Sequence, residues 1–205
     1  MEILAVIPAR GGSKGIPRKN MRLMDGVPLI EHSIRHALEC SEISSVAVSS
    51  DSQEILSFVQ QFSEVYALDR DSALAQDAIT LDPVIYDAVM RVERIQNKVF
   101  DAVVTLQPTS PLLSVNTLTK AIQQFKLSKV DSVISVVNNP HLSWGKNSSN
   151  EIVPKYQKRL NRQQLPPDYL ETGAFFISKR NVLLPDSRLG SIVGVYEVPF
   201  NESID

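Results

Sequence analysis

Short apolar runs alternate along the chain with segments whose apolar residues recur at helical spacing. The apolar or β-branched runs predict strands over 3–7, 45–49, 65–68, 101–106, 133–137, 173–177 and 194–198. The helical patterns predict amphipathic helices over about 28–40, 52–62, 82–96 and 114–125. Periodicity alone does not distinguish the first run from a short buried helix. The alternation predicts an α/β fold with a doubly wound, mainly parallel sheet and helices on both faces.

Polar residues predict where three of these helices begin. Asp51 offers an N-cap to the helix at 52–62, and Ser114 offers one to the helix that follows it. Asp82 followed by Pro83 combines an N-cap with a proline at the first helical position.

The alternating pattern breaks between Pro140 and Asp168. This segment is polar and rich in cations, which predicts a hairpin-like excursion with little core of its own. Such an excursion either stays mobile or packs on a second subunit. The second arrangement would cover its apolar residues, namely Ile152, Val153, Tyr156 and Leu160.

A basic, glycine-rich turn follows the first predicted strand, in the segment Pro8-Ala-Arg-Gly-Gly-Ser-Lys-Gly-Ile-Pro-Arg-Lys-Asn20. Glycines let backbone N–H groups approach phosphate oxygens, and Arg10, Lys14, Arg18 and Lys19 add positive charge. The spacing fits neither a Walker loop nor the dinucleotide fingerprint. Because open α/β sheets bind ligands at the carboxyl ends of their strands, the turn predicts a polyphosphate site; the alternative is a solvated basic turn.

Two more loops follow predicted strands. Residues 69–81 have no periodicity, and a loop of this length in a compact domain is usually functional or mobile. In Gln107-Pro-Thr-Ser-Pro111 two prolines forbid a helix and fix a turn that presents Gln107, Thr109 and Ser110. This polar turn suits a hydroxylated substrate; the alternative is a proline-stiffened connection.

Composition limits the function classes. A chain of 205 residues suits one domain, and a net charge of −2 gives no bulk attraction to nucleic acid or to an anionic membrane. The sequence has no signal peptide pattern and no apolar run of membrane-spanning length, so we expect a soluble, cytoplasmic protein. Cys40 is the single cysteine and is expected to be a small buried residue. His32 and His36 are four apart without an evident third metal ligand, which favours a solvated surface.

These parts together favour nucleotidyl transfer. Attack on an α-phosphate requires neutralisation of charge more than covalent participation by the protein, and the basic turn supplies cations. Mg²⁺ usually takes one or two carboxylates plus phosphate oxygens, and Asp205 is the candidate ligand. No Ser/His/Asp arrangement is readable.

Seven segments, in this order and over essentially the whole chain, carry a resemblance to a known family. They are Ile7-Pro-Ala-Arg-Gly-Gly-Ser-Lys-Gly-Ile-Pro-Arg-Lys-Asn20, Val48-Ser-Ser-Asp51, Arg70 with Asp77, Gln107-Pro-Thr-Ser-Pro-Leu112, Arg162-Gln-Gln-Leu-Pro166, Gly173-Ala-Phe-Phe and Ser203-Ile-Asp205. The chain resembles the acylneuraminate cytidylyltransferases, or CMP-sialic acid synthetases. The resemblance implies a Rossmann-like homodimer that transfers CMP from CTP, with Mg²⁺, to the anomeric hydroxyl of N-acetylneuraminic acid or a related nine-carbon keto acid sugar, releasing pyrophosphate. Alternatives are CMP activation of legionaminic, pseudaminic or 3-deoxy-octulosonic acid, or an inactive nucleotide-binding fragment.

The resemblance also implies roles for single residues. Lys19, Arg10 and Lys14 would act in catalysis on the phosphates. The nucleotide would contact Ala9, Arg10, Gly11, Gly12, Ser13, Lys14, Asn20, Arg70 and Thr80. The sugar would contact Gln107, Thr109, Ser110, Arg162 and Gln163, and Asp205 would bind the metal. A guanidinium such as that of Arg162 can make two parallel hydrogen bonds to the sugar carboxylate.

The expected organisation is a single nucleotidyltransferase domain over 1–205. Residues 140–170 resemble the family's dimerisation arm, which projects into the partner's active site. The family usually continues beyond Ser203-Ile-Asp205 to a second metal-binding aspartate, so we expect a C-terminus that is cut short. Glu171-Thr172-Gly173 stands where members of the family often have Asn-Gly. Bacterial members use a lysine near the start of the arm, and no lysine at 141–146 clearly matches it.

Overall fold

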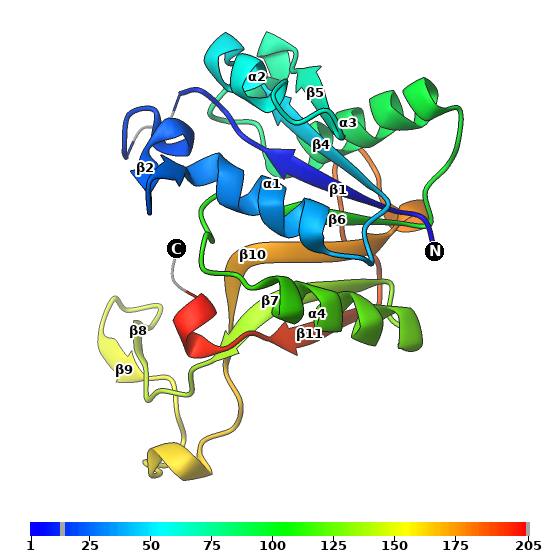
Figure 1. The fold of residues 1–205 in the computed structure, drawn as a ribbon. Coiled ribbons are helices and arrows are strands. Elements are labelled where there is room, and N and C mark those ends of the chain that lie inside the picture. The colour runs from blue at the N-terminus through cyan, green and yellow to red at the C-terminus, as the bar shows by residue number, and fades with distance from the viewer. Residues whose placement is uncertain (13–14, 204–205) are drawn as a thin grey trace.

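A computed structural model of the chain describes residues 1–12 and 15–203, and a seven-stranded sheet forms the centre of this part (Figure 1). The strand order is β11-β7-β10-β6-β1-β4-β5. The strands are β1 (Ile3–Pro8), β4 (Ser45–Ser50), β5 (Val65–Asp69), β6 (Ala102–Leu106), β7 (Ser132–Asn138), β10 (Tyr169–Lys179) and β11 (Val193–Glu197). All seven predicted strands are therefore present.

The sheet is mainly parallel, as predicted. β1 pairs in parallel with both β4 and β6, β4 with β5, and β11 with β7. β10 is antiparallel to β6 and β7. It enters the sheet from the excursion after β7 without a helical crossover, and such a return does not require parallel pairing.

Helices cover both faces of the sheet, which confirms the doubly wound prediction. Side chains of α1 (Leu29–Glu39), α2 (Gln53–Val59) and α4 (Val115–Leu127) pack in one core with Ile3, Ala5 and Ile7 of β1. On the other face, α3 (Leu81–Gln96) packs on Leu4 and Val6. Every residue of β1 is buried because its two faces both meet helices.

Two of the three predicted helix caps are wrong. Ser52 precedes α2, whereas the Asp51 carboxylate accepts a hydrogen bond from the Gly11 backbone N–H at 2.9 Å. α3 begins at Leu81, before Asp82, and its N-cap residue is Thr80. The Asp82 carboxylate instead lies 3.4 Å from Arg188. The predicted cap at Ser114 is confirmed, since its side chain accepts from the Thr117 N–H at 3.1 Å.

A small hairpin after the basic turn was not predicted. It consists of β2 (Leu23–Met24) and β3 (Val27–Pro28), joined at Asp25 and Gly26 with φ values of 51° and 82°. Positive φ at both central residues is the requirement of a type I′ turn, which Asp-Gly satisfies readily. The dipeptide was the available sequence signal.

The excursion contains a second hairpin, formed by β8 (Trp144–Lys146) and β9 (Ile152–Pro154), and a 3-10 helix η3 (Arg162–Gln164). Figure 1 shows it projecting from the body of the sheet beyond β7 and β10. The Trp144 and Tyr156 rings meet edge to face with centroids 5.9 Å apart. Ile152 remains exposed. Dimerisation through this arm therefore stays a prediction.

Cys40 is buried, as predicted. His32 is half-buried, and its Nε2 lies 3.0 Å from the Met24 carbonyl oxygen, so the prediction of a solvated surface holds only in part. Burial, followed by the nearby His32, lowers the pKa of His36. No helix within the described ranges is both long and apolar enough to cross a bilayer.

Candidate active site

A cavity of about 420 Å³ lies where the carboxyl ends of β1 and β6 meet. It is bounded on one side by the basic turn and on the other by the turn after β6. The residues that line it are Pro8, Arg10, Gly15, Ile16, Lys19, Asn20, Arg70, Leu81, Gln107, Pro108 and Thr109. Six predicted site residues, from three separate loops, therefore surround one space.

The basic turn is held to the sheet through its backbone. The Ala9 N–H donates to the Ser49 carbonyl at 2.9 Å, and the Gly11 N–H donates to Asp51 at 2.9 Å. A Cβ on Gly11 would lie 2.8 Å from the Ser52 Cβ, so this close approach requires glycine. Asn20 is buried and donates from Nδ2 to the Arg10 carbonyl at 2.9 Å. Asp51 and Asn20 thus fix the shape of the turn.

The described cations of the turn have different partners. Arg10 forms an ion pair with Asp77 at 2.9 Å, which joins the basic turn to the loop after β5. Arg18 pairs with Glu54 of α2, and neither residue lines the main cavity. Lys19 is half-buried, and its ammonium group forms neither a hydrogen bond nor an ion pair with the described residues. An unpaired cation at a cavity wall is available to an anionic ligand.

Arg70 enters the site from the end of β5 and is only 6% exposed. Its guanidinium donates to the Ser49 carbonyl at 2.6 Å and to the Ser49 hydroxyl at 3.1 Å. Burial lowers the pKa of Arg70, Asp51 opposes this shift, and the charge of Arg10 adds to it. The group nevertheless stays protonated at neutral pH. It therefore contributes a fixed positive charge to the cavity wall.

The turn after β6 places Gln107 and Thr109 at the opposite wall. Ser110 is buried beneath the turn and does not line the cavity. β10 bulges between Glu171 and Phe176, and within this irregularity Gly173 has a φ of 73°. A Cβ there would lie 3.2 Å from the Gln107 Nε2, so Gly173 leaves space for the amide.

The other predicted site residues lie apart from this cavity. Ala9 is buried under the turn, Gly12 is exposed, and Thr80 precedes α3; none of them lines the cavity in the described structure. Arg162 donates to the Asn139 Oδ1 at 3.2 Å, and Gln163 is its neighbour in η3. Within one chain neither reaches the cavity lining. Ser13, Lys14 and Asp205 fall outside the described residues.

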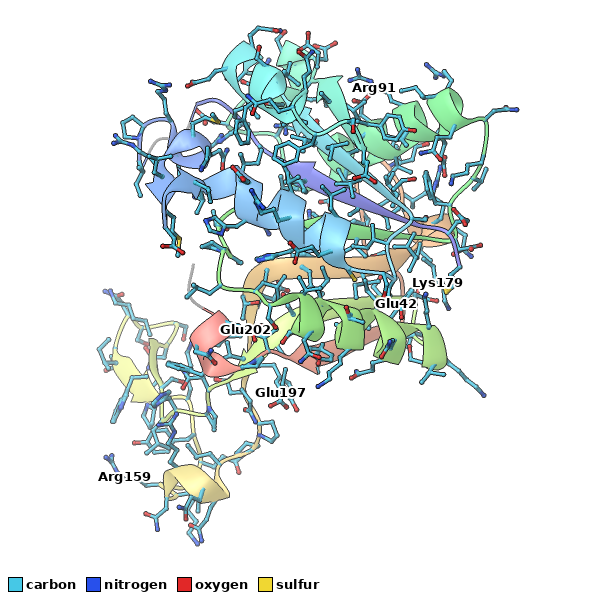
Figure 2. All side chains as sticks on the ribbon, in the orientation of Figure 1. Glu42, Arg91, Arg159, Lys179, Glu197 and Glu202 are labelled. Atoms are coloured by element: carbon cyan, nitrogen blue, oxygen red, sulfur yellow. The ribbon has the colours of Figure 1, made fainter. Side chains whose placement is uncertain are left out.

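Sequence reasoning missed Glu202, in the 3-10 helix η5 (Phe200–Glu202). Its carboxylate is buried and accepts a hydrogen bond from the Ser114 N–H at 2.9 Å. Figure 2 shows Glu202 beside the start of α4, which follows the Gln107 turn. Glu202 therefore ties the C-terminal segment to the element that carries one wall of the cavity. The bond joins residues 88 positions apart, and no local pattern indicates it.

We expect Glu202→Ala to lower the free energy of unfolding by about 1–3 kcal/mol, because the Ser114 N–H loses its acceptor. Urea unfolding followed by circular dichroism measures this loss. Glu202→Gln is the matched control, since its amide oxygen can still accept the bond. Equal losses in the two variants would show that the hydrogen bond is not the cause.

Whether this chain can hold Mg²⁺ depends on which side chains are available as metal ligands. The described residues contain no group of three or more His, Cys, Asp or Glu side chains that could hold a metal ion. Mg²⁺ commonly uses one or two carboxylates together with substrate phosphate oxygens. An ion held mainly by bound nucleotide would not require such a group among the described residues.

Comparisons with known proteins identify the family of the chain. The family model described as Cytidylyltransferase matches residues 4–193. N-acylneuraminate cytidylyltransferase A of Danio rerio is 31% identical over 210 residues, which cover 99% of this chain and 47% of that protein. CMP-N,N'-diacetyllegionaminic acid synthase of Campylobacter jejuni is 30% identical over 209 residues, covering 100% of this chain and 89% of that protein. The chain thus spans about half the length of the first of these relatives.

Among solved structures, a CMP:2-keto-3-deoxy-manno-octonic acid synthetase complexed with CTP superposes with a TM-score of 0.69. The match covers 97% of this chain and 90% of that chain at 19% sequence identity. At this identity the likeness establishes the fold alone.

Proposed function

The chain belongs to the cytidylyltransferase family, and from this premise we propose that it transfers CMP from CTP to the anomeric hydroxyl of an acidic keto sugar, with release of pyrophosphate. The proposed acceptor is N-acetylneuraminic acid or a closely related nine-carbon keto acid sugar. Relatives whose names specify acylneuraminate and diacetyllegionaminic acid support this class of acceptor.

The observation that carries the proposal is the half-buried Lys19, whose ammonium group has no polar partner among residues 1–12 and 15–203, in a cavity shared with Arg10 and Arg70. Three cations around one space favour a ligand with several negative charges. The cavity also lies at the carboxyl ends of two adjacent parallel strands, where open α/β sheets bind their ligands. A nucleoside triphosphate meets both conditions.

In the proposed reaction Lys19 and Arg10 hold the phosphates. Asp77 orients Arg10 before nucleotide binds. A phosphate oxygen of the bound nucleotide then replaces the Asp77 carboxylate as the partner of Arg10, or binds Arg10 alongside it. The acceptor hydroxyl attacks the α-phosphorus and loses its proton to solvent water, a new P–O bond forms to the sugar, and the bond to the β-phosphate oxygen breaks, which releases pyrophosphate. Lys19 stabilises the negative charge on the phosphoryl oxygens, which is the principal task in phosphoryl transfer. Gln107 and Thr109 orient the sugar from the opposite wall.

We assign Mg²⁺ the supporting role of neutralising phosphate charge, with Asp205 as the proposed carboxylate ligand. Residues 140–170 are proposed to act as a dimerisation arm. Arg162 and Gln163 would then reach the sugar bound to a partner subunit, because within their own chain they lie away from the cavity. Lys14 and Ser13 are proposed to complete the phosphate site. Sedimentation velocity at micromolar concentration is expected to show a dimer.

A pyrophosphate-release assay tests the proposed function. With Mg²⁺ and CTP, we expect release that depends on an acidic keto sugar and exceeds release with ATP, GTP or UTP by at least tenfold. A panel of N-acetylneuraminic, legionaminic, pseudaminic and 3-deoxy-octulosonic acids identifies the acceptor. CTP binding without release for every acceptor would contradict the enzymatic proposal and indicate a nucleotide-binding fragment.

A further inference from the structure

Arg188, in the loop between β10 and β11, is a partly buried cation that has no part in the proposed reaction. Its side chain is 16% exposed and lies over the Phe176 ring, with Cζ 4.3 Å from the ring centroid. Its backbone is also held, because the Arg188 carbonyl accepts a hydrogen bond from the Ser178 hydroxyl at 2.5 Å. Two contacts with β10 therefore fix Arg188 against one strand of the sheet.

The guanidinium of Arg188 lies beside the first turn of α3, where its Nη1 is 3.4 Å from the Asp82 Oδ1. However, Nε and Nη1 are both buried and have no hydrogen-bond partner in the described part of the chain. A buried donor without a partner is energetically costly, and an N–H···O bond needs a donor–acceptor distance of about 2.7–3.2 Å. If Asp82 lay about 0.5 Å closer, it could accept a hydrogen bond from Nη1. The pair can therefore tighten.

The start of α3 is part of the wall of the first of two adjoining cavities. This is the cavity at the carboxyl ends of β1 and β6, and it is lined by Leu81, the residue before Asp82. The second cavity, of about 510 Å³, shares Lys19 and Thr109 with it but is lined by no residue of α3. The position of the first turn of α3 therefore affects a ligand in the first cavity.

The charge of Asp82 opposes an anionic ligand in the first cavity, because it lies one residue from Leu81. Arg188 offsets this charge, and a hydrogen bond from Nη1 would hold the carboxylate toward Arg188. Burial lowers the pKa of Arg188, whereas the charges of Asp82 and Glu171 oppose this shift. An arginine nevertheless stays protonated at neutral pH. Since a ligand favours the arrangement that it binds better, an anionic nucleotide favours the tightened pair.

We propose that Arg188 is a positioning residue of the nucleotide site, and that the Asp82 carboxylate accepts a hydrogen bond from Arg188 Nη1 when CTP occupies the first cavity. This inference rests on the proposed function, since it takes CTP as the occupant. Arg188 acts through Asp82 and does not have to touch the nucleotide. The pair then contributes to the affinity for CTP and adds little to the stability of the nucleotide-free protein.

Isothermal titration with CTP and Mg²⁺ tests the inference without turnover. We expect Arg188→Met to weaken CTP binding by about tenfold, which is within the usual range for coupling between two sites. Methionine keeps an unbranched side chain over Phe176 but provides neither charge nor hydrogen-bond donor. The thermal midpoint of the nucleotide-free protein should change by less than about 3 °C. Arg188→Lys keeps the charge and should recover part of the lost affinity.

Arg94→Met is the matched control. It makes the same chemical change at an exposed position near the other end of α3, and Arg94 lines neither cavity, so CTP affinity should not change. A double-mutant cycle with Asp82→Asn identifies the partner through which Arg188 acts. Because asparagine carries no charge that needs to be offset, the loss caused by Arg188→Met should shrink to less than about threefold in the Asp82→Asn background.

Four results would overturn the inference. Equal CTP affinity in the unmodified protein and in folded Arg188→Met would refute it and leave the proposed function intact. A tenfold loss that persists in the Asp82→Asn background would show that Arg188 does not act through Asp82. A fall of many degrees in the midpoint of nucleotide-free Arg188→Met would show that the pair stabilises the fold instead. If the unmodified protein binds no CTP, the proposed function fails and this inference fails with it.

Discussion

Lys19→Ala is expected to lower kcat/KM for pyrophosphate release by about 10²–10³-fold, the loss seen when a preorganised charge-stabilising group is removed. Lys19 lines the first cavity and has no described hydrogen-bonding or ionic partner, so its charge remains available for phosphate. For the same reason its removal breaks no side-chain hydrogen bond or ion pair within the described part of the chain. We expect the thermal midpoint to change by less than about 2 °C.

Lys120→Ala is the control for this experiment. Lys120 is an exposed cation of α4, outside both cavities, and its loss should affect neither turnover nor the midpoint. If Lys19→Ala instead lowers the midpoint by many degrees while turnover per folded molecule is retained, the role of Lys19 is structural.

Arg180→Ala is expected to lower the free energy of unfolding by about 3–5 kcal/mol, the usual effect of removing one partner of a buried ion pair. Arg180 donates from Nε and Nη2 to the Glu93 carboxylate at 2.8 and 2.9 Å, which joins η4 (Arg180–Val182) to α3. Glu93 is only 8% exposed and would be left without its cation. Urea unfolding with a fitted denaturant slope measures the loss.

The loss of unfolding free energy in Arg180→Ala should not depend on pH near neutrality. The hydrogen bond between Arg180 and Glu93 raises the pKa of Arg180, and the ordinary pKa of an arginine already lies far above neutrality. A raised basic pKa contributes stability that is complete below the unfolded-state pKa and is lost only as pH rises through the folded-state pKa. The difference between Arg180→Ala and the unmodified protein should therefore be constant from about pH 6 to 9.

A surface ion pair provides the comparison for Arg180. Lys98 contacts Glu2 at 2.8 Å, and the two side chains are 33% and 54% exposed. Exposed pairs contribute little, so Lys98→Ala should cost less than about 1 kcal/mol. Similar losses for Arg180→Ala and Lys98→Ala would contradict the importance of burial at Glu93.

Much of the fold could be predicted from the pattern of apolar residues, because a strand buried on both faces is a continuous run of apolar residues in the sequence. The five-residue run that begins at Ile3 becomes β1, with helices on each side. The antiparallel direction of β10 was not predictable, since neither apolar content nor propensity encodes strand direction. β10 also begins at Tyr169, well before the predicted start at Gly173. Its first three residues are exposed, so they do not form the continuous apolar run that marks a strand buried on both faces.

The candidate site was predictable where loops follow adjacent strands. The turns at Arg10 and Gln107 meet because β1 and β6 are neighbours in the sheet. The contacts that hold these loops were not predictable, since Asp51 and Glu202 bond to backbone N–H groups far away in the sequence. Asp51 was instead interpreted through its local position before a helix. Local spacing therefore located the residues that line the cavity better than the residues that support them.

The most direct test is a crystal structure of the protein with CTP. The account predicts density for the triphosphate in the cavity between the basic turn and Gln107, with phosphate oxygens within hydrogen-bonding distance of Lys19 and Arg10. Nucleotide bound at another place, with these two side chains still facing solvent, would contradict it.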